Sequence, residues 1–387
     1  MSSSKPVVVY GASGYTGRLV AEYLREYNLP FVAAGRNADR VKDVMAHLPG
    51  VETAQFDCVG VEHNVDALTE LFTGAKVVIN TVGPFAKLGP ECVQACLNAG
   101  CHYTDTTGEQ DWMIVCDEQF GERFAEKGLL LSPGVAQMYT TGEIAANLAL
   151  ETPGLDTLDI LVLWKGFPTT ASTATIFANL LSPRYYLEQN EYAAWTPQTH
   201  EVIVPGQHAT ALALDWGGTS HPVWFKRDPR VANCKAIGGI FDRQLLEGVV
   251  AMATEVGAKA AEMEPAEQQK FLAETAASVQ SEMPPRENQR INISMDSVHA
   301  SGPGGMVHAV LRGTCNYKQT GLLNAYAAHC LVRGSTRHAG FGSACQAFGH
   351  RELLACLQAF GLMAPPIITG HVASAPVGFS PASLGRL

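Results

Sequence analysis

The feature that most constrains this chain is a glycine-rich turn between a short apolar run and a helical pattern near the N-terminus. Val7–Tyr10 is a β-branched run typical of a buried parallel strand, and Gly11–Gly17 follows it at once. From Arg18 to Leu24 the apolar side chains then recur at helical spacing. A strand, a glycine turn and a helix in this order predict a dinucleotide-binding unit of the Rossmann type.

Each glycine of the turn has its own predicted role. Gly11 permits the tight turn, Gly14 lets the backbone approach a pyrophosphate, and Gly17 lets the helix lie close to the sheet. The spacing is GxxGxxG rather than GxGxxG, so the strand–helix context carries the prediction. The alternative is a tight turn without a ligand, which would not need glycine at all three positions.

The end of the second predicted strand indicates which dinucleotide is bound. Phe31–Gly35 is this strand, and it ends at Arg36, with Asn37 beside it and Arg40 one turn further on. A domain that selects NAD usually carries Asp or Glu here to hold the ribose 2′-hydroxyl. A guanidinium suits a 2′-phosphate instead, so we predict NADP(H). The alternative is a solvated surface arginine.

The next strands bring further residues toward the same edge. Val51–Asp57 is predicted as a strand that leads to Asp57 and Cys58, where an adenine edge could be met. Lys76–Asn80 is predicted as a buried strand that ends in the loop Val82–Phe85, and the Gly83-Pro84 pair in this loop is expected near the ribose or nicotinamide.

A helix from Gly89 to Ala99 and a strand from Cys101 to Asp105 are predicted next. They place Tyr103, Asp105 and Glu109 at or near another ligand-facing edge. The alternatives are that Asp105 caps the following helix and that Tyr103 packs in the core.

The second part of the chain changes character. Leu129–Val135 is predicted as the last Rossmann strand with its exit loop, and Val223–Phe225 carries a strand signal within an aromatic, Pro- and Gly-rich stretch. Ala258–Val279 is predicted as one exposed helix or lid, and Asn292–Gly313 as a β-hairpin.

These patterns predict an α/β protein with an N-terminal Rossmann fold and an α+β domain for substrate binding and dimerisation. The predicted bounds are 1–136 for the Rossmann domain and 137–320 for the α+β domain. Helices in 321–371 are expected to pack back on the Rossmann domain, and 372–387 is predicted to be a tail.

Composition excludes several other classes of function. The net charge of −10 argues against a nucleic-acid or anionic-membrane surface, and no apolar stretch reaches the roughly 18 residues of a membrane span. The start of the chain lacks a signal-peptide apolar region, and the ten cysteines show no close CxxC pair, which favours a reduced, cytoplasmic protein. HExxH, GxSxG and Tyr-x-x-x-Lys are all absent from the sequence, so metal catalysis, a hydrolase elbow and the short-chain dehydrogenase mechanism are not predicted.

A family resemblance adds to this interpretation. The segment VINTVGPFAKLGPECVQACLNAGCHYTDTTGE, from Val78 to Glu109, and the opening VVVYGASGYTGRLVAEYL resemble the saccharopine dehydrogenase-like oxidoreductases over residues 6–135. That superfamily includes saccharopine reductases, which form a C–N bond, and trans-acting enoyl reductases, which reduce C=C bonds in polyketide-derived lipids. The resemblance implies a nicotinamide cofactor, most often NADPH in the enoyl reductase branch. The cofactor-binding positions that it implies are Gly11, Ser13, Gly14, Tyr15, Thr16, Arg36, Val82, Gly83, Pro84 and Phe85.

One departure from the family concerns the substrate. Members often carry an aspartate-containing turn after the strand at 129–131, and residues 134–142 contain no aspartate here. This departure removes support for a substrate carried over from better-known members.

Reduction of an activated double bond needs a donor for the developing negative charge. The candidate catalytic residues are Tyr103, Tyr139 and Lys165, with Thr141 as a further donor. Each of these could equally cap, pack or face water.

Three functions stay open from the sequence. The first is NADPH-dependent reduction of an activated C=C bond in a fairly apolar small molecule. The second is reductive amination or opine-type chemistry at a C–N bond, although Arg227, Arg230 and Arg312 form no recognisable carboxylate clamp. The third is a catalytically silent NADPH-binding protein. We expect a small-molecule substrate, no metal, no nucleic-acid partner and a homodimer.

Overall fold

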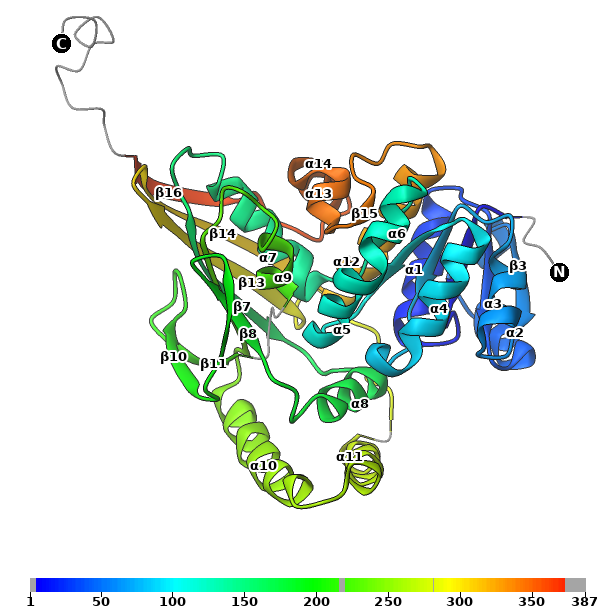
Figure 1. The fold of residues 1–387 in the computed structure, drawn as a ribbon, viewed down its shortest axis with the longest axis horizontal. Coiled ribbons are helices and arrows are strands. Elements are labelled where there is room, and N and C mark those ends of the chain that lie inside the picture. The colour runs from blue at the N-terminus through cyan, green and yellow to red at the C-terminus, as the bar shows by residue number, and fades with distance from the viewer. Residues whose placement is uncertain (1–4, 216–219, 281, 373–387) are drawn as a thin grey trace, which may run out of the picture.

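The computed structural model describes residues 5–215, 220–280 and 282–372, which form two sheets with helices packed around them (Figure 1). The first sheet is parallel, in the order β15-β6-β5-β4-β1-β2-β3. Its strands are β1 (Val7–Tyr10), β2 (Phe31–Gly35), β3 (Phe56–Gly60), β4 (Val77–Asn80), β5 (His102–Asp105), β6 (Leu130–Ser132) and β15 (Gly340–Phe341). The α/β class and the N-terminal Rossmann fold predicted from the sequence are confirmed.

The apolar strands β1, β2 and β4 are buried along their whole length because helices cover the sheet on its two faces. These helices include α1 (Tyr15–Glu26), α2 (Ala38–Ala46), α3 (Val65–Phe72), α4 (Phe85–Ala99), α5 (Gln110–Val115) and α6 (Gly121–Glu126). A Cβ on Gly17 would lie 2.8 Å from Ala12 Cα, closer than atoms tolerate. Glycine at this position therefore lets α1 begin against the turn, as predicted.

Two secondary-structure elements of the first domain, one strand and one helix, begin at other residues than the sequence predicted. The predicted strand Val51–Asp57 is a short 3-10 helix at Val51–Thr53 followed by β3, because Gly50 enters the left-handed region at φ +70° and starts a tight turn. Helix α4 begins at Phe85, earlier than predicted, with Pro84 at its N-cap.

The second sheet has the order β10-β11-β12-β7-β13-β14-β16. These strands are β7 (Thr157–Lys165), β10 (Thr199–Ile203), β11 (Thr210–Leu214), β12 (Asn233–Ile240), β13 (Ile293–Gly302), β14 (Gly305–Thr314) and β16 (Ile367–Val372), with β8 (Tyr185–Glu188) and β9 (Glu191–Ala194) beside them. The predicted hairpin of β13 and β14 is confirmed. The strand predicted at Val223–Phe225 is wrong: these side chains belong to helix α9 (Ser220–Phe225) and are all buried, and a short apolar run does not distinguish a buried strand from a buried helix.

The chain crosses between the two sheets more than once. Helix α7 (Gln137–Ala149) packs on β13 and β14, and α12 (Asn316–Val332) packs against α1. The chain then adds β15 to the first sheet, forms α13 (Ala344–Phe348) and α14 (His350–Ala359), and returns to the second sheet as β16. Strand β6 is therefore not the last Rossmann strand, because Gly340 N donates to Leu129 O at 2.7 Å and extends the sheet. Most of the predicted tail, 373–387, lies outside the described residues.

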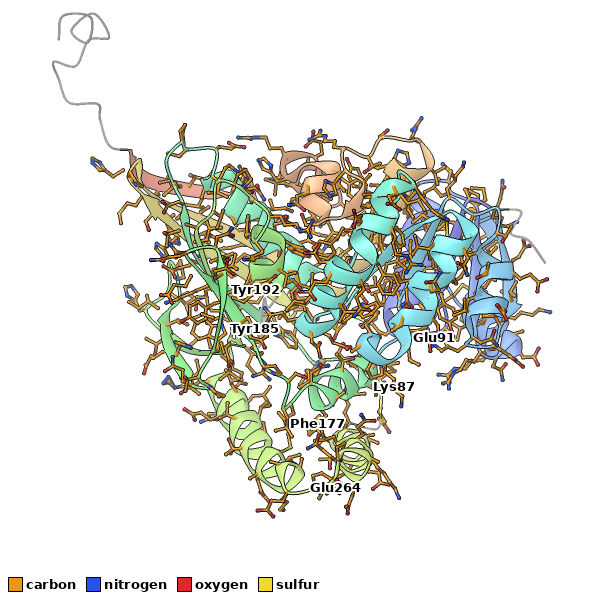
Figure 2. The ribbon with its side chains drawn as sticks, in the orientation of Figure 1. Lys87, Glu91, Phe177, Tyr185, Tyr192 and Glu264 are labelled. Carbon is orange, nitrogen blue, oxygen red and sulfur yellow. The ribbon has the colours of Figure 1, made fainter. Side chains whose placement is uncertain are left out.

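Three helices form an arm that projects from the second sheet (Figure 1). They are α8 (Thr170–Ala178), α10 (Arg243–Ala261) and α11 (Pro265–Val279), and they share a small apolar cluster around Phe177 and Leu272. The single helix predicted at 258–279 is two helices, because Pro265 fits only the first turn of a new helix. Figure 2 shows Phe177 on α8 and Glu264 at the tip of the arm, where α11 begins.

Candidate cofactor site and substrate cleft

The turn between β1 and α1 has the shape that a pyrophosphate requires. Gly11 adopts φ +93°, and a Cβ there would lie 2.8 Å from Val82 Cγ2. Helix α1 begins after Gly14 without a side chain that caps its first N–H groups. The uncapped N-terminus of a helix that follows a glycine turn fits a dinucleotide phosphate.

The end of β2 places a cation where the 2′-phosphate of NADP(H) would lie. Arg36 is exposed there, and in the described part of the chain it makes no ion pair. Asn37 is the N-cap of α2, and its Oδ1 accepts a hydrogen bond from Arg40 N at 2.9 Å. Asn37 therefore shapes the turn that presents Arg36 and Arg40.

We expect the change Arg36→Ala to weaken NADPH binding by about 10- to 150-fold, since a charge-assisted hydrogen bond contributes about 1.5–3 kcal/mol. NADH binding should be unchanged, because NADH lacks the 2′-phosphate. Titrations with NADPH, NADH and 2′,5′-ADP measure both effects, and Arg123→Ala serves as a surface control. Equal NADPH affinity in the wild type and the Arg36→Ala variant would contradict the assigned role.

A second loop meets the glycine turn. Thr81 Oγ1 donates to the Tyr10 carbonyl at 3.1 Å, and the Val82 amide donates to Asn80 Oδ1 at 2.9 Å. The Glu109 carboxylate then accepts from Phe85 N and Ala86 N, each at 2.7 Å. These two N–H groups are the first of helix α4, so Glu109 anchors the loop Val82–Phe85 from the loop that follows the neighbouring strand β5. Glu109 is nearly fully buried, and burial raises its pKa to about 7 although both backbone donors oppose the rise.

Asp105 and Tyr103 are buried framework residues, and their cofactor and catalytic roles stay predictions. The Asp105 oxygens accept from Thr107 N, Gly134 N, Trp112 Nε1 and the Tyr103 hydroxyl at 2.8–3.1 Å. Tyr103 is completely buried in the core between the sheet and its helices. Asp105, supported by Tyr103, thereby connects the loop that follows β5 with the loop that follows β6.

The strand predicted to carry Asp57 and Cys58 to an adenine edge is misplaced, and the adenine contact itself stays a prediction. Strand β3 runs on to Gly60, so the ligand-facing end of the strand lies beyond them. Asp57 pairs in register with Val32, near the beginning of β2, and forms an ion pair with Lys5 at 2.8 Å. The error follows from the strand boundary, which the sequence placed several residues too early.

A cleft of about 990 Å³ opens beside the two cofactor loops. Thr16, Thr81, Gly83, Phe85 and Glu109 line it from the Rossmann domain. Its other walls come from the ends of β7 and β12, from α8 and α10, and from the start of α12. Clefts of this size and position are typical of small-molecule sites in α/β enzymes.

Tyr139 and Lys165, two of the donors predicted from the sequence, lie in different places relative to the cleft. Tyr139, in the first turn of α7, lines the cleft, and its hydroxyl lies so close to Gly108 that a Cβ at Gly108 would collide with it. Lys165 is exposed at the end of β7 and is absent from the cleft wall, whereas Trp164 beside it lines the cleft. Adjacent strand residues point to opposite faces, so Lys165 points away from the cleft, and its catalytic role stays a prediction without support from the cleft.

Thr141 lies deeper in the protein. It is fully buried, and its hydroxyl donates to Gln137 O at 2.7 Å within α7. It is therefore not available as a donor to a substrate in the cleft.

Sequence reasoning missed Tyr317, in the first turn of α12. Tyr317 lines the cleft, its hydroxyl accepts from Thr169 N at 3.0 Å, and its ring meets Tyr15 of the glycine turn edge to face at 5.3 Å. Burial raises the pKa of both Tyr139 and Tyr317, so each phenol stays protonated near neutral pH. The contacts of Tyr317 come from elements about 150 to 300 residues away, which no local pattern reveals.

The arginines considered as a carboxylate clamp lie elsewhere. Arg227 pairs with Asp117 and Arg230 with Asp228, while Arg312 donates to the Pro205 carbonyl. Among the described residues that line the cleft, Arg184 is the one cation, and it faces Asp215 at 3.5 Å. Within residues 5–215, 220–280 and 282–372 there is no group of three or more His, Cys, Asp and Glu side chains that could hold a metal ion.

A glycine turn at a helix N-terminus, an arginine at the end of β2 and a cleft at the carboxyl edge of the sheet define an NADP(H)-binding protein with a cleft beside its cofactor loops. Residues 7–124 match the saccharopine dehydrogenase NADP binding domain, which confirms the predicted cofactor and resemblance. Residues 140–372 match the family of unknown function DUF5938, and the chain belongs to this family.

The similar curated proteins match about a third of the chain or less. A lipid droplet localized protein of Caenorhabditis elegans is 33% identical over 132 residues, 32% of this chain and 31% of that protein. A trans-acting enoyl reductase of Mycobacterium leprae is 36% identical over 106 residues, 27% of this chain and 25% of the relative. A mouse saccharopine dehydrogenase-like oxidoreductase is 29% identical over 139 residues, 32% of each chain. The matched stretch thus spans about a third or less of each relative.

Solved dehydrogenases resemble the chain over a greater length. A myo-inositol dehydrogenase from Corynebacterium glutamicum covers 95% of this chain and 98% of its own, at 11% identity and a TM-score of 0.41. An amine dehydrogenase from Mycobacterium smegmatis covers 89% of this chain and 96% of its own, at 10% identity and a TM-score of 0.43.

Proposed function

We propose that this oxidoreductase uses NADPH to reduce an activated C=C bond of a fairly apolar small molecule. The observation that carries the proposal is the cleft, where both cofactor loops and a set of apolar side chains line one space of about 990 Å³. NADPH supplies a hydride when it is bound. The protein then has to orient the substrate, exclude water and provide a proton.

Tyr139 is the residue that we propose as the proton donor. Its hydroxyl lies beside Gly108, within the loop that follows β5, and Glu109 of the same loop anchors the Val82–Phe85 loop. Because burial raises the pKa of Tyr139, the hydroxyl carries its proton at neutral pH and can donate it to the negative charge that develops after hydride addition.

Two alternatives predict different reactions. Reductive amination of a dicarboxylic substrate would need paired cations, and the described lining residues offer only Arg184, which Asp215 already faces. A catalytically silent NADPH-binding protein would need no substrate cleft beside the cofactor loops.

A substrate panel distinguishes the three functions. We expect apolar enals and enones to accelerate NADPH oxidation, measured by the loss of absorbance of the reduced nicotinamide. Keto acids with amines should accelerate it only under the second function, and no compound should do so under the third, although NADPH binds tightly. An active keto acid with inert enones would overturn the proposal.

The cytoplasmic location and the homodimer belong to the same proposal. All ten cysteines are free thiols, which fits a reducing compartment. In the part of the chain that the structure covers, no helix is both long and apolar enough to cross a membrane.

A further inference from the structure

Helix α10 forms one wall of the cleft with side chains that become smaller along the helix. Leu245, Val249, Ala253 and Gly257 all line the cleft, and their spacing of four residues places them on one face of the helix. From leucine through valine and alanine to glycine, this row recedes step by step over about 18 Å of helix, beside the other lining residues Leu246, Val250, Met252, Thr254 and Ala258. The cleft therefore extends as a channel away from the cofactor loops, along the arm.

Helix α8 and the residues after it form the facing wall. Ile176, Phe177 and Leu181 line the cleft on this side. A Cβ on Gly257 would lie 3.6 Å from Leu181 Cδ2 and 3.8 Å from Leu180 Cδ2. The two walls thus approach so closely at Gly257 that one added Cβ would bring them into van der Waals contact, and this position marks the far end of the channel.

The channel is uncharged and exposes large apolar side chains, although Ser172, Thr173, Thr175, Asn179, Ser182 and Thr254 also line it. None of the described lining residues that α8, α10 and residues 179–182 contribute is charged. Phe167 is 63% exposed, Leu181 43%, Leu245 41% and Val279 46%, and all four line the cleft. Exposed apolar side chains gathered along one cleft indicate a ligand that covers them, because removing apolar surface from water is favourable.

The opposite end of the cleft is polar. Thr81, Glu109, Tyr139 and Tyr317 line it beside the cofactor loops. A ligand that fills the whole cleft needs a polar head at this end and an apolar, flexible tail between the two helices.

We propose that the substrate is an amphiphile with a single unbranched apolar chain, which lies between α8 and α10 and ends at Gly257. The reducible double bond stands near the polar head, beside Tyr139. The position of this bond rests on the proposed function, whereas the chain site is testable without any reaction. The residues Ala253 and Gly257 then determine the longest chain that the protein accepts.

The test compares chain length with the depth of the channel. Straight-chain saturated aldehydes of increasing length are titrated into the protein with NADP⁺ bound, and the matching 2-alkenals are assayed for NADPH oxidation. We expect each added methylene to tighten binding by about three- to fourfold until the channel is full. Gly257→Leu should weaken binding of the longest chains by about tenfold and leave short chains unaffected, and Ala253→Leu should shift the limit to still shorter chains.

The matched control lies on the same helix. Gly248 is exposed, has open space where a Cβ would lie and is not part of the cleft wall, so Gly248→Leu should behave as the wild type. Replacing glycine by leucine favours the helix in both variants, so folding should be retained. If Gly257→Leu fails to fold, Ala253→Leu provides the same test alone.

The outcomes separate this proposal from the proposed function. Affinity independent of chain length, or equal behaviour of Gly257→Leu and Gly248→Leu, would overturn the chain site. Chain-dependent binding without NADPH oxidation would support the chain site and reject the reaction. Oxidation that ignores chain length would support the reaction and reject the chain site.

Discussion

Phenylalanine in place of Tyr139 is expected to lower the turnover of NADPH-dependent reduction by about 100-fold, the lower bound typical of a lost general acid. The substitution removes one oxygen from a ring that lies between Gly108 and the cleft, so the fold should tolerate it. NADPH affinity should be unchanged, because the hydroxyl is proposed to act on the substrate. Steady-state kinetics and a separate NADPH titration measure the two quantities.

Two further variants make this result decisive. Tyr186→Phe is the control outside the cleft, since Tyr186 on β8 contacts Trp195 with tilted rings and is absent from the cleft wall. Tyr317→Phe tests the second buried phenol of the cleft. Loss of turnover in Tyr317→Phe with full activity in Tyr139→Phe would assign the proton donor to Tyr317 instead.

Asp296→Asn is expected to stabilise the protein at pH 8 and to have little effect near pH 4. Asp296 is fully buried on β13, facing α7, and among the described residues neither carboxyl oxygen has a partner with hydrogen-bonding geometry. Burial raises its pKa to about 7, with the Thr141 hydroxyl as the polar neighbour that partly offsets the rise.

The sign of the pH dependence follows from the two pKa values of Asp296. The unfolded chain loses this proton near pH 4, while the folded chain keeps it until about pH 7. Unfolding therefore releases a proton in this range, and the free energy of unfolding falls by about 1.4 kcal/mol per pH unit as pH rises. Asparagine does not titrate, so the variant should gain about 2–4 kcal/mol at pH 8, less what its own buried amide costs.

Urea unfolding at pH 5 and pH 8 measures this difference. Asp159→Asn is the matched control, because Asp159 lies exposed on the neighbouring strand β7. The stabilisation by Asp296→Asn should grow with pH, and that by Asp159→Asn should not. A difference between wild type and Asp296→Asn that stays constant with pH would reject the assigned burial effect.

The parts of the fold that depend on neighbouring residues were predictable from the sequence. The unit β1–turn–α1 follows from a β-branched run, three glycines and a helical apolar pattern within about 20 residues. The β13–β14 hairpin is equally local, since a Gly-Pro-rich turn joins two strand patterns. The bounds of the domains stay a prediction.

One physical cause explains why Lys165, Tyr103 and Asp105 do not line the cleft. Lys165 and Trp164 are neighbours in the sequence, and only the register of β7 in its sheet decides which of them enters the cleft. Tyr103 and Asp105 both lie on β5, and the surrounding loops and Trp112 bury both. The direction of a side chain depends on what packs on each face of the sheet, and that information lies far away in the chain.

The glycine turn and Arg36 determined from the sequence alone that the chain has a Rossmann unit that binds NADP(H), because phosphate binding depends on local backbone shape and one nearby cation. Only the tertiary structure decided what lies opposite that cofactor. Tyr139, Tyr317 and the receding row of side chains on α10 line one cleft because α7, α12 and the arm converge on the carboxyl edge of the first sheet. Such convergence results from packing between distant segments, which spacing along the chain does not encode.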